Sequence, residues 1–392
     1  MNGLDLLVKD WGLMNREYSR LLLRKRGYRL VSMAKTLPKM QSVADLVASK
    51  KDGLLWLKTR SSNQNLNPPK IALGPHADYV VDFFKKEFQP REDLSWIAHF
   101  AQPMLYGRHF SILSSNRRVY EECFIRDRRW RDAVPKSKRE EDSRVAKNVP
   151  GIYLLSGNEF HSNYAHFFYD ILPRLMLFEE AGLLYQFPLI RSPSNPFADA
   201  AYRQMGLGGD NSRVWDDSLW KVDDLYYAST FKQPGACTPE ASEWVRRKLS
   251  PGLEQKPPGK KLFYISRRKG IRAIANESEL VGRLHKWGVI IVEPDRLTLQ
   301  EQIELFSEAG LIVGAQGAGM LNALWAPRGC AVLEIINPVF FSGVYWTLAE
   351  SLGHRYGLVS CAPPTGPIPC QQLTNCQVDL VCRAVDALLQ NR

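Results

Sequence analysis

The C-terminal part of the sequence alternates short apolar segments with segments of helical period, and this alternation constrains the fold more than any other feature. Expected strands are residues 262–266, 289–292, 311–315, 331–336 and 356–360. Between them, Asn276 with Glu279 and Thr298 with Glu301 have the spacing of helix-opening capping boxes. Strands that alternate with helices form βαβ units, so this region is predicted to be a parallel, doubly wound sheet.

The chain length predicts more than one domain. A chain of 392 residues exceeds one ordinary core and suits two medium α/β domains with additions. Residues 250–260 contain three prolines and two glycines, which cannot continue a helix or a central strand. The predicted organisation is a helical or irregular extension over 1–95, an α/β domain over 96–250, a linker over 251–260, a second α/β domain over 261–375 and a C-terminal helix over 376–392. Within 96–250, strands are expected near 110–113, 119–125, 152–155 and 187–190.

The net positive charge favours anionic partners but does not identify one. The formal charge is +11, so nucleic acid, nucleotide phosphates, acidic polysaccharide and anionic lipid all suit it, as do simple solvated faces. Residues 126–147 are dense in charge of both signs and include Arg128 and Trp130. No nucleic-acid-binding module accompanies them, so we expect a solvated loop and no nucleic-acid partner.

The cysteines and the hydropathy of the sequence indicate the cellular compartment of the protein. The seven cysteines are odd in number and scattered without a C-x-x-C pair, which favours a reducing compartment over a disulfide framework or a thiolate metal site. No apolar run reaches the roughly 18 residues that span a bilayer, and no signal-peptide pattern opens the chain. Residues 4–21 form an amphipathic helical pattern with a basic end, which suits either a membrane surface or packing on a domain. A cytoplasmic location is predicted.

A glycine-rich turn is the first candidate for chemistry. The apolar strand 311–315 runs into Gln316-Gly-Ala-Gly319 and then into a helix expected over 318–326. Glycines at such a turn allow close approach of a ligand, and the helix N-terminus offers N–H groups to phosphate. Glu334 at the end of the next strand can accept both hydroxyls of a ribose. Tight helix–strand packing is the alternative explanation, and a dehydrogenase is disfavoured because the order is G-x-x-G-x-G.

A basic cluster follows the first strand of the same region, at the same carboxyl edge. It consists of Arg267, Arg268, Lys269 and Arg272. Guanidinium groups bind phosphate bidentately and stabilise a departing diphosphate, although a solvated basic loop would look alike. Because no Asp-x-Asp follows a strand, the sequence does not require a metal.

The segment from Asn163 to Arg174 holds the candidate reacting groups. In an α-helix, His166 and Asp170 lie at i and i+4 and face the same way, with Asn163 and Arg174 near that line. A carboxylate beside an imidazole raises its basicity, as a general base requires. A structural hydrogen bond is the alternative role for such a pair.

Taken together, these segments resemble glycosyltransferase family 61. The matching motifs are Asn163-Tyr-x-His-Phe-x-x-Asp-x-Leu-Pro-Arg174, Tyr264-Ile-Ser-Arg267 with Arg272, Asn276 and Glu277, and Gly314-x-x-Gly-Ala-Gly-x-x-Asn322 with Pro327, Gly329 and Glu334. They follow one another in the family's order over roughly residues 151–360. One departure is Gln316, which stands where the family usually has histidine and which cannot carry a positive charge.

The resemblance implies a GT-B-like α/β fold, in which two Rossmann-type domains face a cleft and the C-terminal domain binds a nucleotide-sugar. It also implies transfer with inversion, without a cofactor or a metal. His166 and Asp170 are then the catalytic candidates, and Asn163 and Arg174 lie on the acceptor or cleft side. The donor-binding candidates are Ser266, Arg267, Arg272, Gln316, Gly317, Ala318, Gly319, Asn322 and Glu334.

The sequence therefore predicts an inverting glycosyltransferase of bacterial surface polysaccharide synthesis. Its expected partners are a nucleotide-sugar and a glycan or lipid-linked glycan, with peripheral contact at the inner membrane. Two alternatives stay open at this point. One is a catalytically lapsed protein that binds a nucleotide-sugar or a glycan, and the other is an NAD-dependent oxidoreductase.

Overall fold

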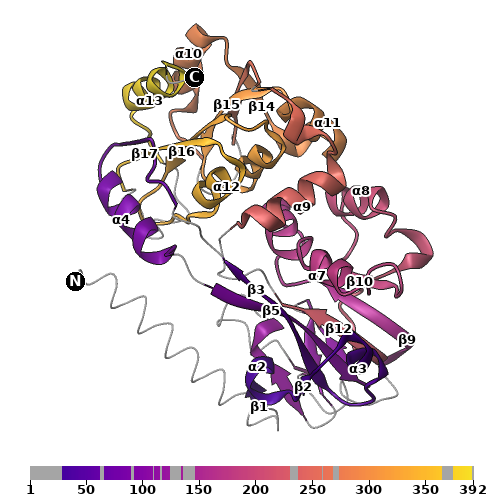
Figure 1. Ribbon diagram of the computed structural model, residues 1–392. Helices are drawn as coiled ribbons and strands as arrows, with labels where there is room; N and C mark the ends of the chain where they lie inside the picture. Colours follow the sequence, from indigo (N-terminus) through magenta and orange to yellow (C-terminus); the bar gives the residue numbers. More distant parts are fainter. Residues whose placement is uncertain are drawn as a thin grey trace. The chain divides into compact units, whose positions relative to one another are not determined.

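The computed structural model divides the chain into two compact units, which are described separately (Figure 1). It describes residues 29–61, 66–89, 92–108, 110–114, 117–123, 134–135, 146–229, 237–257, 259–267, 273–363 and 374–390. The first unit falls within Met1–Arg60, Leu94–Ser162 and Asp170–Thr230. The second falls within Ser61–Asp93, Asn163–Tyr169 and Phe231–Arg392, so the expected linker at 251–260 lies inside it.

The second unit is built on a parallel sheet, as the alternating pattern predicts. Six strands are described in it, in the order β14-β13-β15-β16-β17-β4, and every neighbouring pair is parallel. They are β13 (Lys261–Ile265), β14 (Ile290–Val292), β15 (Ala309–Ala315), β16 (Ala331–Ile336), β17 (Arg355–Ser360) and β4 (Ile71–Leu73). All residues of β15 and β16 are buried, as expected for central strands covered on both faces.

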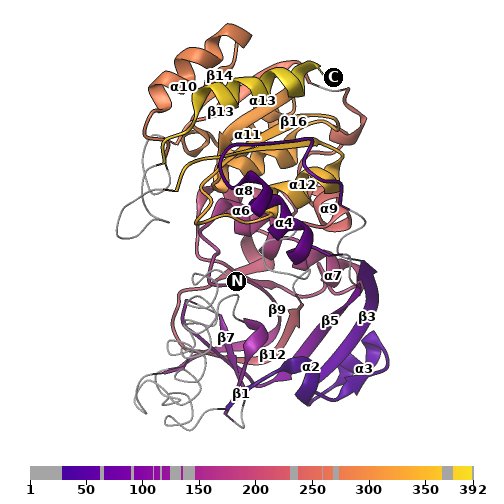
Figure 2. The same cartoon turned by 90° about the vertical axis from the view of Figure 1, so that its left-hand side faces the viewer.

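Helices complete the core of the second unit. The helices are α4 (Ala77–Glu87), α9 (Pro239–Leu249), α10 (Glu277–Leu284), α11 (Leu299–Phe306), α12 (Val344–Leu352) and α13 (Val378–Gln390). Helix α13 packs on β16, β17 and β4 and lies beside α10, as Figure 2 shows. Leu311 and Val313 of β15 belong to the apolar cluster that these two helices cover.

Local sequence signals predicted the helices of this unit only in part. The capping box of Thr298 and Glu301 is confirmed at the start of α11. Asn276 precedes α10 but makes no side-chain cap, because its amide bonds the backbone of Cys376 through both the nitrogen and the oxygen. The helix expected over 318–326 is a 3₁₀ helix, η8 (Ala318–Trp325).

The first unit has a mixed sheet, which differs from the parallel, Rossmann-type sheet expected. Eleven strands are described in it, and the main path runs β1-β8-β7-β6-β12-β5-β3-β2. Strand β9 pairs with β12, β10 with β9 and β11 with β10, and these pairs are parallel. The pairs β12–β5, β12–β6, β6–β7 and β7–β8 are antiparallel.

The elements of the first unit are mostly short. Its strands are β1 (Arg29–Val31), β2 (Lys39–Met40), β3 (Gly53–Ser61), β5 (Glu92–Ala101), β6 (Met104–Tyr106), β7 (Ser111–Leu113), β8 (Arg118–Tyr120), β9 (Lys147–Ser156), β10 (Leu189–Arg191), β11 (Ser212–Val214) and β12 (Trp220–Ala228). Its helices include α2 (Met33–Thr36), α3 (Val43–Ala48), α7 (Arg174–Glu180) and α8 (Pro196–Gln204). The strands expected near 110–113, 152–155 and 187–190 are present with shifted ends.

The expectation of a helical or irregular segment over 1–95 is wrong for the described residues from 29 onward. These residues supply β1, β2 and β3 to the first sheet and β4 with α4 to the second unit. Strands β1, β2 and β4 have only two or three residues, too few for a recognisable periodicity, and β1 and β4 pair with strands distant in sequence. The amphipathic pattern at 4–21 and nearly all of the charged stretch 126–147 lie outside the described residues.

Among the described helices, none has both the length and the apolar composition needed to cross a bilayer. Six cysteines are described, and each is a buried free thiol.

Candidate functional site

The candidate site lies at the carboxyl edge of the parallel sheet, where Arg267 follows β13 and Gln316 follows the adjacent strand β15. Arg267 Nη1 donates to the Gln316 carbonyl at 2.8 Å, although 49 residues separate the two. A Cβ atom added to Gly317 would lie 1.9 Å from Arg267 Nη1. A larger residue here would have to displace the guanidinium group, and this close packing supports the expected convergence of the two motifs.

Glu277 holds the segment that carries Arg267. One of its carboxylate oxygens accepts hydrogen bonds from the Tyr264 hydroxyl at 2.9 Å, the Ser266 hydroxyl at 3.0 Å and the Arg267 N–H at 3.1 Å. Burial and the nearby carboxylate of Glu277 raise the pKa of Tyr264, so its hydroxyl remains a donor. Ser266 is thus engaged with Glu277, a residue of the family motif to which the sequence pattern assigned no role.

The glycine turn is partly exposed where η8 begins. From Leu311 to Met320 every residue is buried except Ala318 and Gly319, which are partly exposed at the start of η8. The Gly317 carbonyl accepts hydrogen bonds from the Tyr345 hydroxyl and from the Met320 N–H, and these two bonds stabilise the turn. An exposed helix N-terminus next to an arginine is an anion-binding arrangement.

Gln316 is buried and pairs with the segment that follows β16. With its amide oriented for both bonds, the nitrogen donates to the Phe340 carbonyl at 2.8 Å and the oxygen accepts from the Ser342 N–H at 2.6 Å. The side chain thus acts as donor and acceptor at once. A protonated histidine offers donors only and could not make both bonds.

Asn322 is fully buried and forms a hydrogen bond with the glycine turn. Its amide nitrogen donates to the Gly319 carbonyl at 3.0 Å, and its oxygen accepts from the Tyr164 hydroxyl at 3.0 Å. The same hydroxyl accepts from Trp325 Nε1 at 2.9 Å. Tyr164 therefore links the segment Asn163–Tyr169 to the turn inside the second unit, a role that the sequence pattern did not indicate.

Glu334 lies within β16 and is fully buried. The hydroxyl of Tyr356, from the neighbouring strand β17, donates to it. Burial and the carboxylate together raise the pKa of Tyr356, which keeps the phenol protonated. The structure therefore places Glu334 inside the sheet, and its role in holding a ribose stays a prediction.

The segment of His166 is less regular than the α-helix expected. Asn163 caps α6 (Tyr164–His166), accepting from the N–H groups of Ala165 at 2.9 Å and His166 at 3.2 Å. Residues Phe167–Ile171 then form a π-helical turn, a widening that is frequent at functional sites. The Tyr169 hydroxyl lies 2.9 Å from His166 Nδ1.

Asp170 and Arg174 belong to the first unit, whereas His166 belongs to the second. Arg174 opens α7 and is fully buried, with its Nε donating to the Asp170 carbonyl at 3.3 Å and its guanidinium 5.0 Å from the Tyr227 ring centre. This is an interior position of the first unit. The acceptor role of Arg174 and the pairing of His166 with Asp170 stay predictions.

Part of the predicted basic cluster cannot be placed. Arg268, Lys269 and Arg272 lie outside the described residues, so Arg267 represents the cluster here. Among the described residues, no group of three His, Cys, Asp or Glu side chains has the arrangement of a metal site.

Known proteins are similar to this chain in the region that carries these contacts. The model of the family described as Glycosyltransferase 61 matches residues 164–333, somewhat less than half of the chain. The match begins at Tyr164 and includes Arg267, Glu277 and the glycine turn. The chain therefore contains a glycosyltransferase 61 region, and the resemblance seen in the sequence is confirmed there.

Three relatives illustrate the range of similarity. An EGF domain-specific O-linked N-acetylglucosamine transferase of Drosophila melanogaster is 31% identical over 120 residues, covering 29% of this chain and 22% of that protein. Protein O-linked-mannose beta-1,4-N-acetylglucosaminyltransferase 2 of Bos taurus is 26% identical over 240 residues, covering 52% and 41%. The protein of the same name from Homo sapiens is 25% identical over 236 residues, covering 51% and 40%. The chain thus spans less than half the length of these relatives.

Proposed function

We propose that this chain is a glycosyltransferase that moves a sugar from a nucleotide-sugar to a hydroxyl group of a glycan acceptor. The observation that carries the proposal is the packing of Arg267 on Gly317, beside the partly exposed N-terminus of η8. This contact lies inside the region that matches the glycosyltransferase family.

In the proposed mechanism, the diphosphate of the donor binds the N–H groups at Ala318 and Gly319. The Arg267 guanidinium adds positive charge where the nucleoside diphosphate leaves. Its position is set in advance by the bond to the Gln316 carbonyl and by the Glu277 carboxylate that holds its backbone. Stabilising the leaving group through fixed donors lowers the barrier without reorganisation during the reaction.

Transfer is proposed to proceed with inversion and without an essential metal, with His166 or Asp170 taking the proton of the attacking hydroxyl. A single base suffices for an inverting displacement, because the acceptor attacks the face opposite the leaving group. The widened helical turn between the two residues supports a functional role for this segment. The proposal includes a GT-B arrangement, with the donor bound by the second unit.

N-acetylglucosamine is the donor sugar that we propose first, because the relatives described above are named as transferases of this sugar. Their names give protein-linked acceptors, whereas the prediction from sequence was a bacterial surface polysaccharide. The matched relatives are animal proteins and do not test that setting. The acceptor class proposed here is therefore a glycan, either free, protein-linked or lipid-linked.

A melting-temperature screen tests the proposal directly. UDP-N-acetylglucosamine, UDP-glucose, GDP-mannose, UDP, GDP and NAD are each added to the full chain. A ligand at a hundredfold excess over its Kd stabilises the native state by about 2.7 kcal/mol. We expect stabilisation by UDP-N-acetylglucosamine and UDP but not by NAD, and sugar release only when a glycan acceptor is present.

The same screen separates the alternatives. Stabilisation by NAD alone would favour the oxidoreductase. A nucleotide-sugar that binds without turnover over a panel of acceptors would favour a lapsed enzyme. No shift with any nucleotide or nucleotide-sugar would refute the donor site.

A further inference from the structure

A second candidate binding site lies in the first unit, and none of the residues that line it was assigned to chemistry from the sequence. It is a hollow of about 650 Å³, and its wall includes Leu37, Lys50, Asp52, Arg118, Asp223 and Asp224. This volume is in the range of sites for small molecules. All of these residues belong to the first unit.

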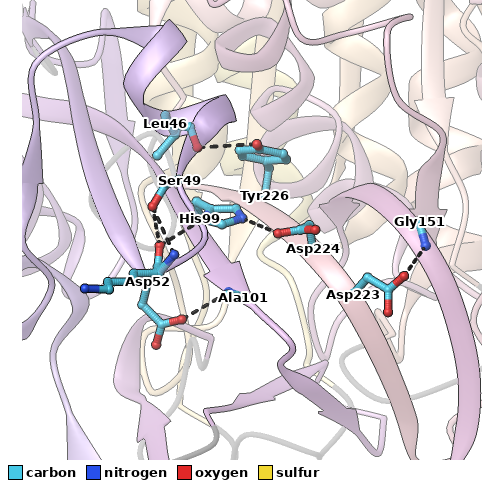
Figure 3. Close-up of polar contacts among 10 residues, drawn as sticks. Leu46, Ser49, Asp52, His99, Ala101, Gly151, Asp223, Asp224 and Tyr226 are labelled. Atoms are coloured by element: carbon cyan, nitrogen blue, oxygen red, sulfur yellow. Dashed lines mark hydrogen bonds and ion pairs between the residues drawn. The ribbon is translucent and has the colours of Figure 1, made fainter.

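Two neighbouring aspartates reach the hollow because β12 and β9 pair irregularly. The register shifts between Val222 and Asp224, where Pro150 and Gly151 of β9 oppose the single residue Asp223. Such a bulge breaks the alternation that would send adjacent side chains to opposite faces. Asp223 accepts from the Gly151 N–H at 2.9 Å, which stabilises the bulge (Figure 3).

The loop on the opposite wall is held in place by a buried histidine. His99 is 1% exposed, and its Nδ1 lies 3.0 Å from the Lys51 carbonyl while its Nε2 lies 2.8 Å from Asp224 (Figure 3). The Ser49 hydroxyl also donates to the Lys51 carbonyl, at 2.6 Å. The backbone at Lys51 is therefore positioned before any ligand binds, which reduces the entropic cost of binding.

Asp52 is a half-buried carboxylate of the wall. One of its oxygens accepts from the Ala101 N–H at 3.1 Å. Burial raises the pKa of Asp52, while the Ala101 N–H, His99 and Tyr120 act in the opposite direction. A desolvated carboxylate with a fixed orientation is a strong acceptor for a ligand hydroxyl group.

The hollow is balanced in charge, although the whole chain carries +11. Three basic residues, Lys50, Lys51 and Arg118, face three acidic residues, Asp52, Asp223 and Asp224. A polyanion such as a nucleotide or an acidic glycan would meet repulsion from the carboxylates. A neutral ligand with many hydroxyl groups can donate to the carboxylates and accept from the ammonium and guanidinium groups at the same time.

From this arrangement we infer that the hollow of the first unit binds a neutral oligosaccharide. Leu37 and Pro38 supply an apolar part of the wall for the C–H face of a sugar ring, and the six charged side chains supply the hydrogen bonds. The inference names a carbohydrate site in addition to the proposed donor site. It does not depend on transferase activity, because saccharide binding by this unit needs no nucleotide.

The test is a calorimetric titration of the full chain with cellobiose and with N,N′-diacetylchitobiose. We expect saturable binding of at least one of them. Asp52→Asn keeps the shape of the side chain and an acceptor for the Ala101 N–H, but it removes the charge, so affinity should fall about tenfold. Lys50→Ala changes an exposed side chain and should lower the affinity without affecting folding.

The matched control is Asp210→Asn, the same change of charge at an exposed position of the first unit outside the hollow. It should bind like the unaltered chain. Equal affinity in all three variants, or no binding of either disaccharide, would overturn the inference. So would tighter binding of a sulfated disaccharide from heparin. The melting shift with UDP-N-acetylglucosamine, measured on the same samples, should be unchanged in Asp52→Asn, so a failure here is distinguishable from a failure of the donor site.

Discussion

The two sheets of this protein place their candidate sites by different means. In the second unit all described strand pairs are parallel, so the ends of β13 and β15 meet at one edge and bring Arg267 against Gly317. In the first unit antiparallel pairs send strand ends to both edges, and the hollow is made from a loop, a turn and a bulge. In a parallel sheet the carboxyl ends of successive strands lie at one edge, where a site can form. In the mixed sheet of the first unit, the candidate site is formed by local irregularities instead.

The two proposals assign different chemistry to the two units. The turn in the second unit offers N–H groups and a guanidinium to an anion. The hollow in the first unit offers balanced charges to a neutral ligand. Substitutions in one unit should therefore change one binding activity and leave the other intact, and the following experiments test that division.

The largest expected effect is on turnover. Asp170→Asn and His166→Ala should each reduce the rate of sugar transfer by about 10²- to 10⁴-fold, the range of general-base catalysis. Donor binding, measured by melting shift, should persist. His161→Ala removes a nearby histidine that has no proposed role and serves as the control. Turnover retained in both variants would show that the base lies elsewhere.

The second largest effect is expected on nucleotide affinity, from a substitution that adds a side chain at Gly317. Gly317→Ala places a methyl group 1.9 Å from the present position of Arg267 Nη1, so the guanidinium must shift and its bond to the Gln316 carbonyl should weaken or break. Nucleotide affinity should fall by about tenfold or more, as the loss of a charge-assisted hydrogen bond predicts. Titration with UDP measures it. Saccharide binding by the first unit should be unaffected.

Gly282→Ala is the control for this substitution. Gly282 lies inside α10, and a Cβ atom there meets nothing within 4 Å. It should leave nucleotide affinity unchanged and stabilise the protein by about 0.4–1 kcal/mol, because alanine reduces the entropy of the unfolded chain. If both alanine variants bind UDP equally well, the turn does not hold the diphosphate.

A third experiment tests whether Tyr164 belongs structurally to the second unit. Tyr164→Phe removes the donor to Asn322 and the acceptor of Trp325 Nε1. Leaving these buried groups unsatisfied should lower the free energy of unfolding by about 1–3 kcal/mol, as measured by urea denaturation. Tyr185→Phe, at a side chain 55% exposed, should have almost no effect. Equal stability of the two variants would contradict the proposed network.

The last experiment concerns pH. His354 is buried in the second unit with Nε2 2.9 Å from the Ala323 carbonyl, and burial together with Arg246 and Arg328 lowers its pKa to about 3 from 6.5. The unfolded chain therefore binds more protons than the native state between these values. This contribution to stability is complete above pH 6.5 and is lost as pH falls toward 3, by up to about 1.4 kcal/mol per pH unit.

His354→Gln keeps an N–H donor but does not titrate. Unfolding measured from pH 7 to pH 4.5 should show a shallower loss of stability for the variant than for the unaltered chain. Identical slopes would mean that His354 does not control this dependence.

The secondary structure of the second unit was largely predictable, and that of the first was not. Strands β15 and β16 are uniformly apolar segments of six or seven residues, and Thr298 with Glu301 forms a complete local signal. By contrast, β1 of the first unit and β4 of the second have three residues each, and each pairs with a strand far away in sequence. Local periodicity cannot detect such elements.

For the candidate site, residue types were predictable but their contacts were not. The motif around Arg267 and the glycine turn indicate a phosphate site through their residue types and their places after strands. The bond between them, the three hydrogen bonds to Glu277 and the pairing of Gln316 with Phe340 and Ser342 depend on how the strands and loops pack.

By itself, then, the sequence determined the parallel sheet, the turn after β15 and the family region, because each depends on residues close together in the chain. Only the tertiary structure decided that Glu334 is buried beside Tyr356, that Arg174 lies in the interior of the first unit, and that a bulge opposite Asp223 helps form a hollow. These outcomes depend on strand register and on which segments share a core, and the contacts that set them join residues tens of positions apart.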